Sequence, residues 1–144
     1  MISDFADPKD LAKNVESARV ISKELKMKVK IRPHINEDGV KNPEYLIDEK
    51  LADLKNIQGL GGIKHGLDSS KKQQCEYTVF NLSAFDTVEP EMLKNKLNGI
   101  YKLYGEKYAG QRMVFIYKRK AVKVSWQDVV DGKATDLLKE LQEQ

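Results

Sequence analysis

The sequence has one cysteine in 144 residues, Cys75, and no long apolar run. A lone cysteine forms no internal disulfide and no cysteine-based zinc site, so the fold depends on its hydrophobic core, and a reducing cytoplasm suits it. No stretch approaches the roughly 20 apolar residues of a membrane-spanning helix. The first residues, MISDFADPKD, lack the basic and apolar segments of a signal peptide, and we therefore expect none in this sequence.

Neither sign of charge dominates the chain. The 25 basic and 22 acidic residues give a net charge of +3, and 40% of the residues are hydrophobic, which is the balance of one globular domain. Basic residues do form two local stripes, which suit a polyanion, although an ordinary solvated strand face gives the same pattern. The stripes are Lys118, Arg119 and Lys120 with Lys123, and Lys26, Lys28 and Lys30 with Arg32.

Apolar periodicity indicates helices that alternate with strands. Asp7 and Pro8 are an N-cap and a first-turn proline, and apolar residues at steps of three and four continue that helix to about residue 26. The further elements we expect are a strand over 26–32, a hairpin over 44–47 and 50–55, a glycine-rich loop over 59–66, a short helix over 68–76, a strand over 77–82, a helix over 90–110, strands over 113–117 and 121–126, and a helix over about 134–142. This order predicts a single α/β domain over 1–144, with its core at about 8–126 and a mixed central β-sheet flanked by helices.

The expected hairpin contains an unusual pair of acidic residues. A two-residue turn at Asp48 and Glu49 would place Glu44 directly opposite Asp53. Like charges at opposed positions of a sheet are destabilising, whereas a divalent cation between two carboxylates makes the same arrangement favourable. The register therefore predicts a metal site at Glu44 and Asp53.

Lys55 follows Asp53 by two residues, so both side chains project from the same face of the strand. An ammonium group beside a metal-bound water can orient that water or stabilise charge on a reacting phosphate. Carboxylates, metal and lysine together indicate phosphodiester hydrolysis.

The segment Pro43-Glu44, eight residues, then Asp53-Leu54-Lys55 resembles the signature of the PD-(D/E)xK nuclease superfamily, with glutamate at the first acidic position, where aspartate is usual. The resemblance implies a restriction-endonuclease-like α-β-β-β-α-β core and a divalent metal, Mg²⁺ with Mn²⁺ or Zn²⁺ as alternatives. It also implies a third acidic ligand on the first helix, for which Glu16 is the best match and Glu24 the second. Gln73 to Tyr77 has the spacing of a Q-x-x-x-Y motif found in some members.

Residues 42–47 and 51–55 are also similar to the C-terminal nuclease domains of bacterial contact-dependent growth inhibition and related polymorphic toxins. That likeness implies an endonuclease toxin that cuts tRNA, with DNA as the alternative substrate. It implies export as part of a larger parent protein, action in the cytoplasm of a target bacterium, and a tight-binding immunity protein, for which we expect an acidic surface. We expect the domain to be monomeric.

Several other residues are candidates for substrate binding. Lys71, Lys72 and Gln73 follow the glycine-rich loop, in which His65 is a candidate general acid, and Lys118, Arg119 and Lys120 are candidates for phosphate contacts. For most of these residues, simple exposure to solvent is the competing interpretation. The glycine-rich loop lacks the lysine followed by serine or threonine of a P-loop, which excludes that kind of nucleotide site. The rival to the nuclease hypothesis is a non-catalytic binding module in which Glu44 and Asp53 pair with lysines.

Overall fold

The computed structural model describes residues 8–32 and 45–142, and the side chains from residue 14 onward within that first range. The elements, in chain order, are α1 (Pro8–Leu25), β1 (Val29–Ile31), β2 (Tyr45–Ile47), β3 (Lys50–Asn56), α2 (Gly62–Lys72), β4 (Tyr77–Asn81), α3 (Pro90–Tyr104), the 3₁₀ helix η1 (Gly105–Tyr108), β5 (Arg112–Tyr117), β6 (Lys120–Ser125), α4 (Trp126–Val130), α5 (Ala134–Leu138) and the 3₁₀ helix η2 (Lys139–Gln142). No helix in these ranges is long and apolar enough to cross a membrane.

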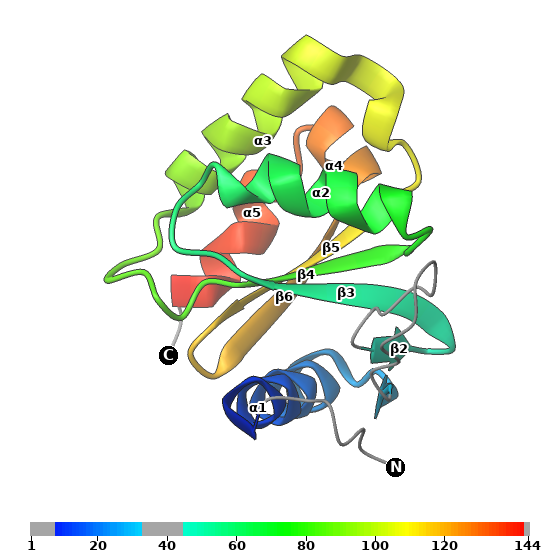
Figure 1. Cartoon of the computed structure of the whole chain (residues 1–144). Coiled ribbons are helices and arrows are strands. Elements are labelled where there is room, and N and C mark those ends of the chain that lie inside the picture. The colour runs from blue at the N-terminus through cyan, green and yellow to red at the C-terminus, as the bar shows by residue number, and fades with distance from the viewer. Residues whose placement is uncertain (1–7, 33–44, 143–144) are drawn as a thin grey trace.

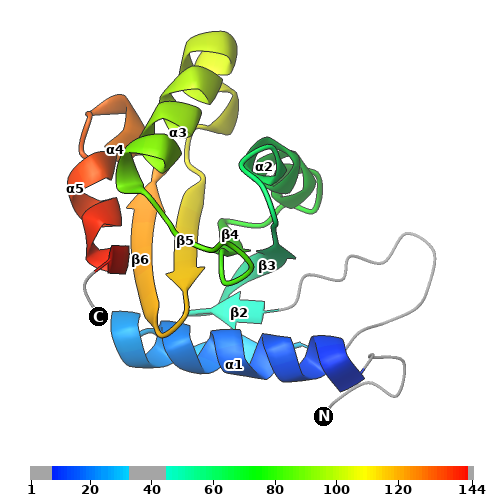
Figure 2. The same cartoon turned by 90° about the vertical axis from the view of Figure 1, so that its left-hand side faces the viewer.

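The strands form one mixed sheet of six, in the order β1-β2-β3-β4-β5-β6. The central strands β3, β4 and β5 are parallel, and the remaining neighbours are antiparallel. Helix α1 covers one face of the sheet, and α2, α3, α4 and α5 lie on the other, as Figures 1 and 2 show. The predicted α/β class, with a mixed sheet flanked by helices in a single domain, is confirmed.

Each face of the sheet carries its own hydrophobic core. Ala52 and Leu54 of β3 pack in the cluster that includes Ile21 of α1. Phe80 and Phe115 belong to the cluster on the other face, with Leu67 of α2. Because side chains alternate along a strand, Asp53 and Lys55 project to the side of α2 and not to the side of α1.

The hairpin between β2 and β3 has the predicted register. Tyr45 pairs with Ala52, Leu46 with Leu51, and Ile47 with Lys50. The turn residues Asp48 and Glu49 have φ angles of 47° and 70°, the left-handed conformation that a two-residue type I′ turn requires at both positions. The Asp48 carboxylate accepts a hydrogen bond of 2.9 Å from the Lys28 backbone N–H, which ties the turn to the chain leading into β1.

The predicted glycine-rich loop over 59–66 is a loop only in its first part, which contains Gly59 and Gly61. Gly62 and Gly66 lie within α2, which begins before the expected helix start at residue 68. A Cβ at Gly66 would lie 2.5 Å from Cε1 of Phe80 and 3.2 Å from Cγ of Lys55, so glycine here permits close packing of the helix on the sheet. The prediction failed because glycine was interpreted as a sign of backbone freedom, whereas this glycine serves close approach.

Three other boundaries differ from the predictions. The expected strand over 26–32 is reduced to Val29–Ile31, since Lys26 adopts a φ of 57°. Helix α3 ends at Tyr104, and the chain continues as η1 from Gly105, whose φ is 55°. Helix α4 was not predicted, although Ser125 and Asp128 form a capping box at its start.

Replacing Gly66 with alanine should lower the free energy of unfolding by about 1–3 kcal/mol, because Phe80 would have to move within a packed core. Gly99→Ala is the matched control: Gly99 also lies in a helix, and a Cβ there meets no atom of the described residues within 4 Å. The control should stabilise the protein by up to about 1 kcal/mol through helix propensity. Urea unfolding of both variants measures the difference, and equal effects would contradict the close-packing explanation.

Candidate active site

Asp53 is the most deeply buried charged residue in the described part of the chain. It lies in the middle of β3 and is 2% exposed. Burial of a carboxylate is costly unless other groups bond to it. The cost of burying the Asp53 carboxylate therefore has to be offset by hydrogen bonds and charges around it, and the end of α2 supplies two of these groups.

Three polar groups reach the same oxygen of Asp53. The Lys55 Nζ lies 3.1 Å from Oδ2, the Gln73 Nε2 donates to Oδ2 at 3.1 Å, and the Ser69 Oγ donates to it at 3.3 Å. Gln73 also donates to the Ser69 Oγ at 3.1 Å, so the two residues at the end of α2 support each other. Among the described residues, these contacts leave Oδ1 of Asp53 as the oxygen available to a further ligand.

Two buried hydroxyl groups lie on β4 and α2, the elements that pack beside Asp53. Thr78 of β4 is the register partner of Asp53, and Ser70 belongs to the buried face of α2. Neither Thr78 Oγ1 nor Ser70 Oγ has a hydrogen-bond partner within the described residues. A buried hydroxyl without a partner costs about 1–3 kcal/mol. Such a cost is tolerated most readily where a ligand or an ordered water completes the bonding.

The structure brings only part of the predicted metal site together. Glu44 lies outside the described residues, so its pairing with Asp53 stays a prediction. Glu16 is on α1, against the opposite face of the sheet, where it lines a cleft with Asn56 and Asn81. The structure therefore does not place Glu16 beside Asp53 as a third ligand. Within the described ranges there is no group of three histidine, cysteine, aspartate or glutamate side chains that could hold a metal.

Of the expected substrate-binding residues, some lie at the Asp53 site and others lie elsewhere on the domain. Gln73 belongs to the Asp53 site, whereas Tyr77 is buried in the α1-side core, so the two ends of the Q-x-x-x-Y spacing are separated by the sheet. His65 is exposed on α2 and does not lie in a loop. The remaining candidates are Lys71 and Lys72, which are exposed at the end of α2, Lys118 and Arg119, which form the turn after β5, and Lys120, whose Nζ lies 3.6 Å from the Glu24 carboxylate.

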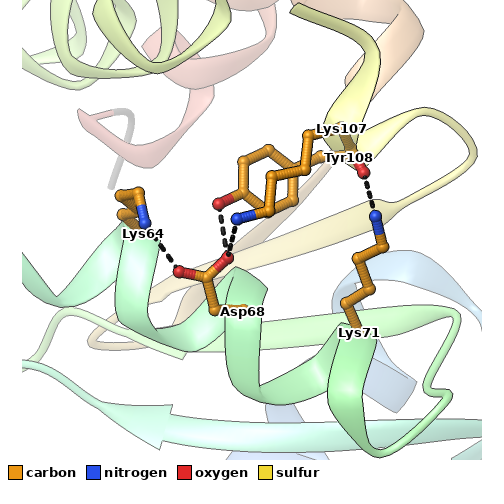
Figure 3. A network of polar contacts seen from close by, with 5 residues as sticks. All are labelled: Lys64, Asp68, Lys71, Lys107 and Tyr108. Atoms are coloured by element: carbon orange, nitrogen blue, oxygen red, sulfur yellow. Dashed lines mark hydrogen bonds and ion pairs between the residues drawn. The ribbon is translucent and has the colours of Figure 1, made fainter. Parts of the chain in front are cut away.

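A second polar network joins α2 to η1 and was not predicted from the sequence (Figure 3). Asp68 accepts hydrogen bonds from Lys64 at 2.7 Å and from the Tyr108 hydroxyl at 2.5 Å, and Lys107 lies 3.3 Å from the same carboxylate. Lys71 donates to the Lys107 backbone oxygen at 2.7 Å. By helical spacing, these residues occupy the flank of α2 away from Ser69 and Gln73. The network holds α2 from the side opposite Asp53.

The charge on Asp68 depends on these contacts. Burial alone would raise the pKa of Asp68, but the hydrogen bonds from Lys64, Tyr108 and Lys107 outweigh it and lower the pKa from 3.8 to about 2. Burial and the bond to Asp68 both raise the pKa of the Tyr108 hydroxyl, which therefore remains a donor at neutral pH. The spacing Lys64-x-x-x-Asp68 was the available sequence signal, but its partners at 107 and 108 are distant in the chain.

The lowered pKa of Asp68 predicts a loss of stability in acid. The unfolded state takes up a proton near pH 3.8 and the folded state only near pH 2, so the stabilisation is present above about pH 4 and lost as the pH falls towards 2. Thermal melting across this range should show a steeper decline for the wild type than for Asp68→Asn. Asp136→Asn, at a carboxylate whose side chain is 88% exposed, is the control and should keep the wild-type decline. An unchanged decline in Asp68→Asn would contradict the proposed role of the network.

The fold and the polar site together define an α/β domain in which the buried Asp53 carboxylate pairs with Lys55 on the face of the sheet that α2 covers. The sequence profile of the contact-dependent growth inhibition CdiA C-terminal domain matches residues 41–122, more than half of the chain. The chain therefore belongs to the CdiA C-terminal domain family. Domains of this family form part of a larger exported protein, and membership implies a toxic effector.

The fold is also found in a solved structure. A chain of the CdiA-CT/CdiI toxin and immunity complex from Burkholderia pseudomallei superimposes with a TM-score of 0.58 over 87% of this chain and 99% of that chain. The two sequences are 16% identical, so this likeness concerns the fold and not the chemistry of the site. No curated protein sequence matches the chain.

Proposed function

We propose that this domain is a metal-dependent endonuclease of the PD-(D/E)xK type. The observation that carries the proposal is the convergence of Lys55, Ser69 and Gln73 on the buried Asp53 carboxylate. An ion pair with a purely structural role does not require two further donors to the carboxylate, or an unpartnered hydroxyl group on its register partner Thr78. Membership of a toxin family agrees with a reaction that damages the recipient cell.

Asp53 and Glu44 would hold the divalent cation. The donor chemistry at Asp53 fits a hard cation, because Mg²⁺ is commonly bound by one or two carboxylates together with water and substrate phosphate. Mg²⁺ is the expected metal, with Mn²⁺ and Zn²⁺ as alternatives. When bound, such an ion supplies charge stabilisation at the phosphate and acidifies a bound water.

The residues around Asp53 have separate tasks. Gln73 and Ser69 hold the carboxylate in one orientation, since both donate to Oδ2. Lys55 is about one-third exposed, so its ammonium group can contact both Asp53 and an incoming phosphate. It would orient the attacking water or stabilise the negative charge that develops on the phosphate.

The proposed substrate is tRNA, with DNA as the alternative. Lys72 is exposed at the end of α2, next to Gln73, where it can attract the phosphate backbone. Lys71 is exposed as well, but it lies on the other flank of α2 and donates to the Lys107 backbone oxygen. Incubation of the purified domain with total tRNA and with plasmid DNA tests this proposal. Cleavage of one substrate that EDTA abolishes and excess Mg²⁺ restores is the expected result. Cleavage unaffected by EDTA would contradict the metal assignment.

The rival function, a non-catalytic binding module, has one observation in its favour. The ion pair between Asp53 and Lys55 satisfies both charges without any metal. Under this alternative the domain would bind nucleic acid or protein and leave both tRNA and plasmid DNA intact at every metal concentration. The same incubation therefore separates the two functions.

An immunity protein is the proposed partner, as in the toxin and immunity complex that shares the fold. A toxin made within its own cell has to be blocked before it reaches its target. We propose that the domain acts as a monomer in the cytoplasm of the recipient bacterium.

A further inference from the structure

A cleft of about 530 Å³ lies on the face of the sheet opposite Asp53. It is bounded by α1 on one side and by the carboxyl ends of the parallel strands β3, β4 and β5 on the other. Its polar lining includes Glu16, Asn56, Asn81, Ser83 and Lys118, and its apolar lining includes Val20 and Ile116. Ligands of open α/β sheets bind at this end of the strands, and the volume is in the usual range of small-ligand sites.

The polar side chains of the cleft are held in place by one another. Asn56 and Asn81 are register partners, and the Asn81 Nδ2 donates to the Asn56 Oδ1 at 2.8 Å. The Asn81 Oδ1 accepts from the Ser83 backbone N–H at 3.1 Å, and the Ser83 Oγ accepts from the Lys118 backbone N–H at 3.3 Å. Within the described residues, the Asn56 Nδ2 group takes no part in these bonds, so it is a donor that a ligand can use.

The groups around the cleft match the edge of a nucleobase. Asparagine amides and carboxylates are the side chains that bind base edges, since a base presents donors and acceptors side by side in one plane. Glu16 is exposed and can accept from an exocyclic amine, while Val20 and Ile116 supply apolar surface for the flat ring. Lys118 supplies a cation for an adjoining phosphate.

We propose that this cleft binds one unpaired base of the nucleic-acid substrate and thereby selects the bond that is cut. The proposal rests on the proposed nuclease function. Asn56 follows Asp53 by three residues on β3, a distance of about 10 Å along the strand. Their side chains project from opposite faces of the sheet, so a base in the cleft and a phosphate at Asp53 would belong to different nucleotides of one strand that passes around the carboxyl edge of the sheet.

The test is the binding of AMP, CMP, GMP and UMP, measured by calorimetry in EDTA with the Asp53→Asn variant, so that hydrolysis plays no part. One nucleotide should bind at least about tenfold more tightly than the weakest, a difference of about 1.4 kcal/mol. Glu16→Gln and Asn56→Ala should each weaken that preferred binding about tenfold. Lys118→Gln should weaken binding of the nucleotide but not of its nucleoside.

Asn95→Ala, at an exposed asparagine of α3, is the matched control and should leave binding unchanged. Glu16→Gln is informative even if the asparagine variant fails to fold, because Glu16 is exposed on α1. Absence of nucleotide binding in a domain that cleaves RNA or DNA would overturn the base-binding proposal and leave the nuclease intact. Binding that Glu16→Gln does not change would also overturn it. Selective binding by a domain without nuclease activity would support the cleft and refute the proposed function.

Discussion

Replacing Lys55 with methionine should reduce phosphodiester cleavage roughly 10²–10³-fold, the usual effect of removing one group that stabilises charge in a transition state. Methionine keeps an unbranched side chain of similar length, so the packing of Cγ against Gly66 should persist. The variant removes the ammonium group and little else. We expect a loss in the cleavage rate of the enzyme–substrate complex more than in substrate affinity, because Lys72 remains to contact the phosphate backbone.

Single-turnover cleavage of the preferred substrate measures this effect. Lys102→Met, at an exposed lysine near the end of α3, is the matched control and should cleave at close to the wild-type rate. Asp53→Asn should be at least as damaging as Lys55→Met, since it also removes a metal ligand. Activity of Lys55→Met within about twofold of the control would remove Lys55 from the proposed mechanism.

Stability has to be measured beside activity in these variants. Asp53 is 2% exposed and bonds to three side chains, so a change at this residue or at its partners can also lower stability. Lys55→Met leaves that carboxylate buried without its cation, which costs about 1–3 kcal/mol. Assays should therefore be run well below the melting temperature of each variant.

Expression of the domain in a cell without its immunity protein should stop growth, and coexpression with that protein should restore it. The restoration requires very little free toxin, so we expect a dissociation constant of about 1 nM or lower, or about −12 kcal/mol. The gene beside this one should encode the partner, a small acidic protein. Its association should be rapid and should slow as salt increases, since opposite charges steer the encounter.

Lys55→Met is the control for this experiment as well, because a folded but inactive toxin should be harmless and still bind the partner. Growth that continues when the wild-type domain is present, folded and soluble would contradict the toxin function. If Lys55→Met remains toxic, the domain is still a toxin, but its toxicity does not come from phosphodiester cleavage at this site.

Local patterns predicted the parts of the fold whose causes are local. The first helix and the hairpin register depend on neighbouring residues, and both were predicted correctly, while the predicted cap Asp7 lies outside the described residues. Asp53 and Lys55 do share one face of β3, as period-two alternation requires. Their pairing with Glu44 remains a prediction, as do the metal and the substrate.

Contacts between distant residues could not be obtained from one sequence. Nothing local indicates that Ser69 and Gln73 reach Asp53, or that Tyr108 reaches Asp68 across 40 positions. The same limit explains the position of Glu16, since its helix was predicted correctly but the face of the sheet that it covers was not determined. The prediction that Gly66 lies in a loop was wrong for a related reason, because the atoms that require glycine at this position belong to Phe80 and Lys55, which are distant in the sequence.

The order of the strands also bears on how the domain acquires its structure. Because β1 to β6 lie in the sheet in the order in which they occur in the chain, each strand pairs with the one that precedes it. No strand has to enter between two that are already joined, and the growing sheet always offers a free edge to the next segment. The β2–β3 and β5–β6 pairs are joined by two-residue turns, so the entropy cost of closing these two hairpins is low. The domain can therefore complete its sheet progressively, from one end to the other.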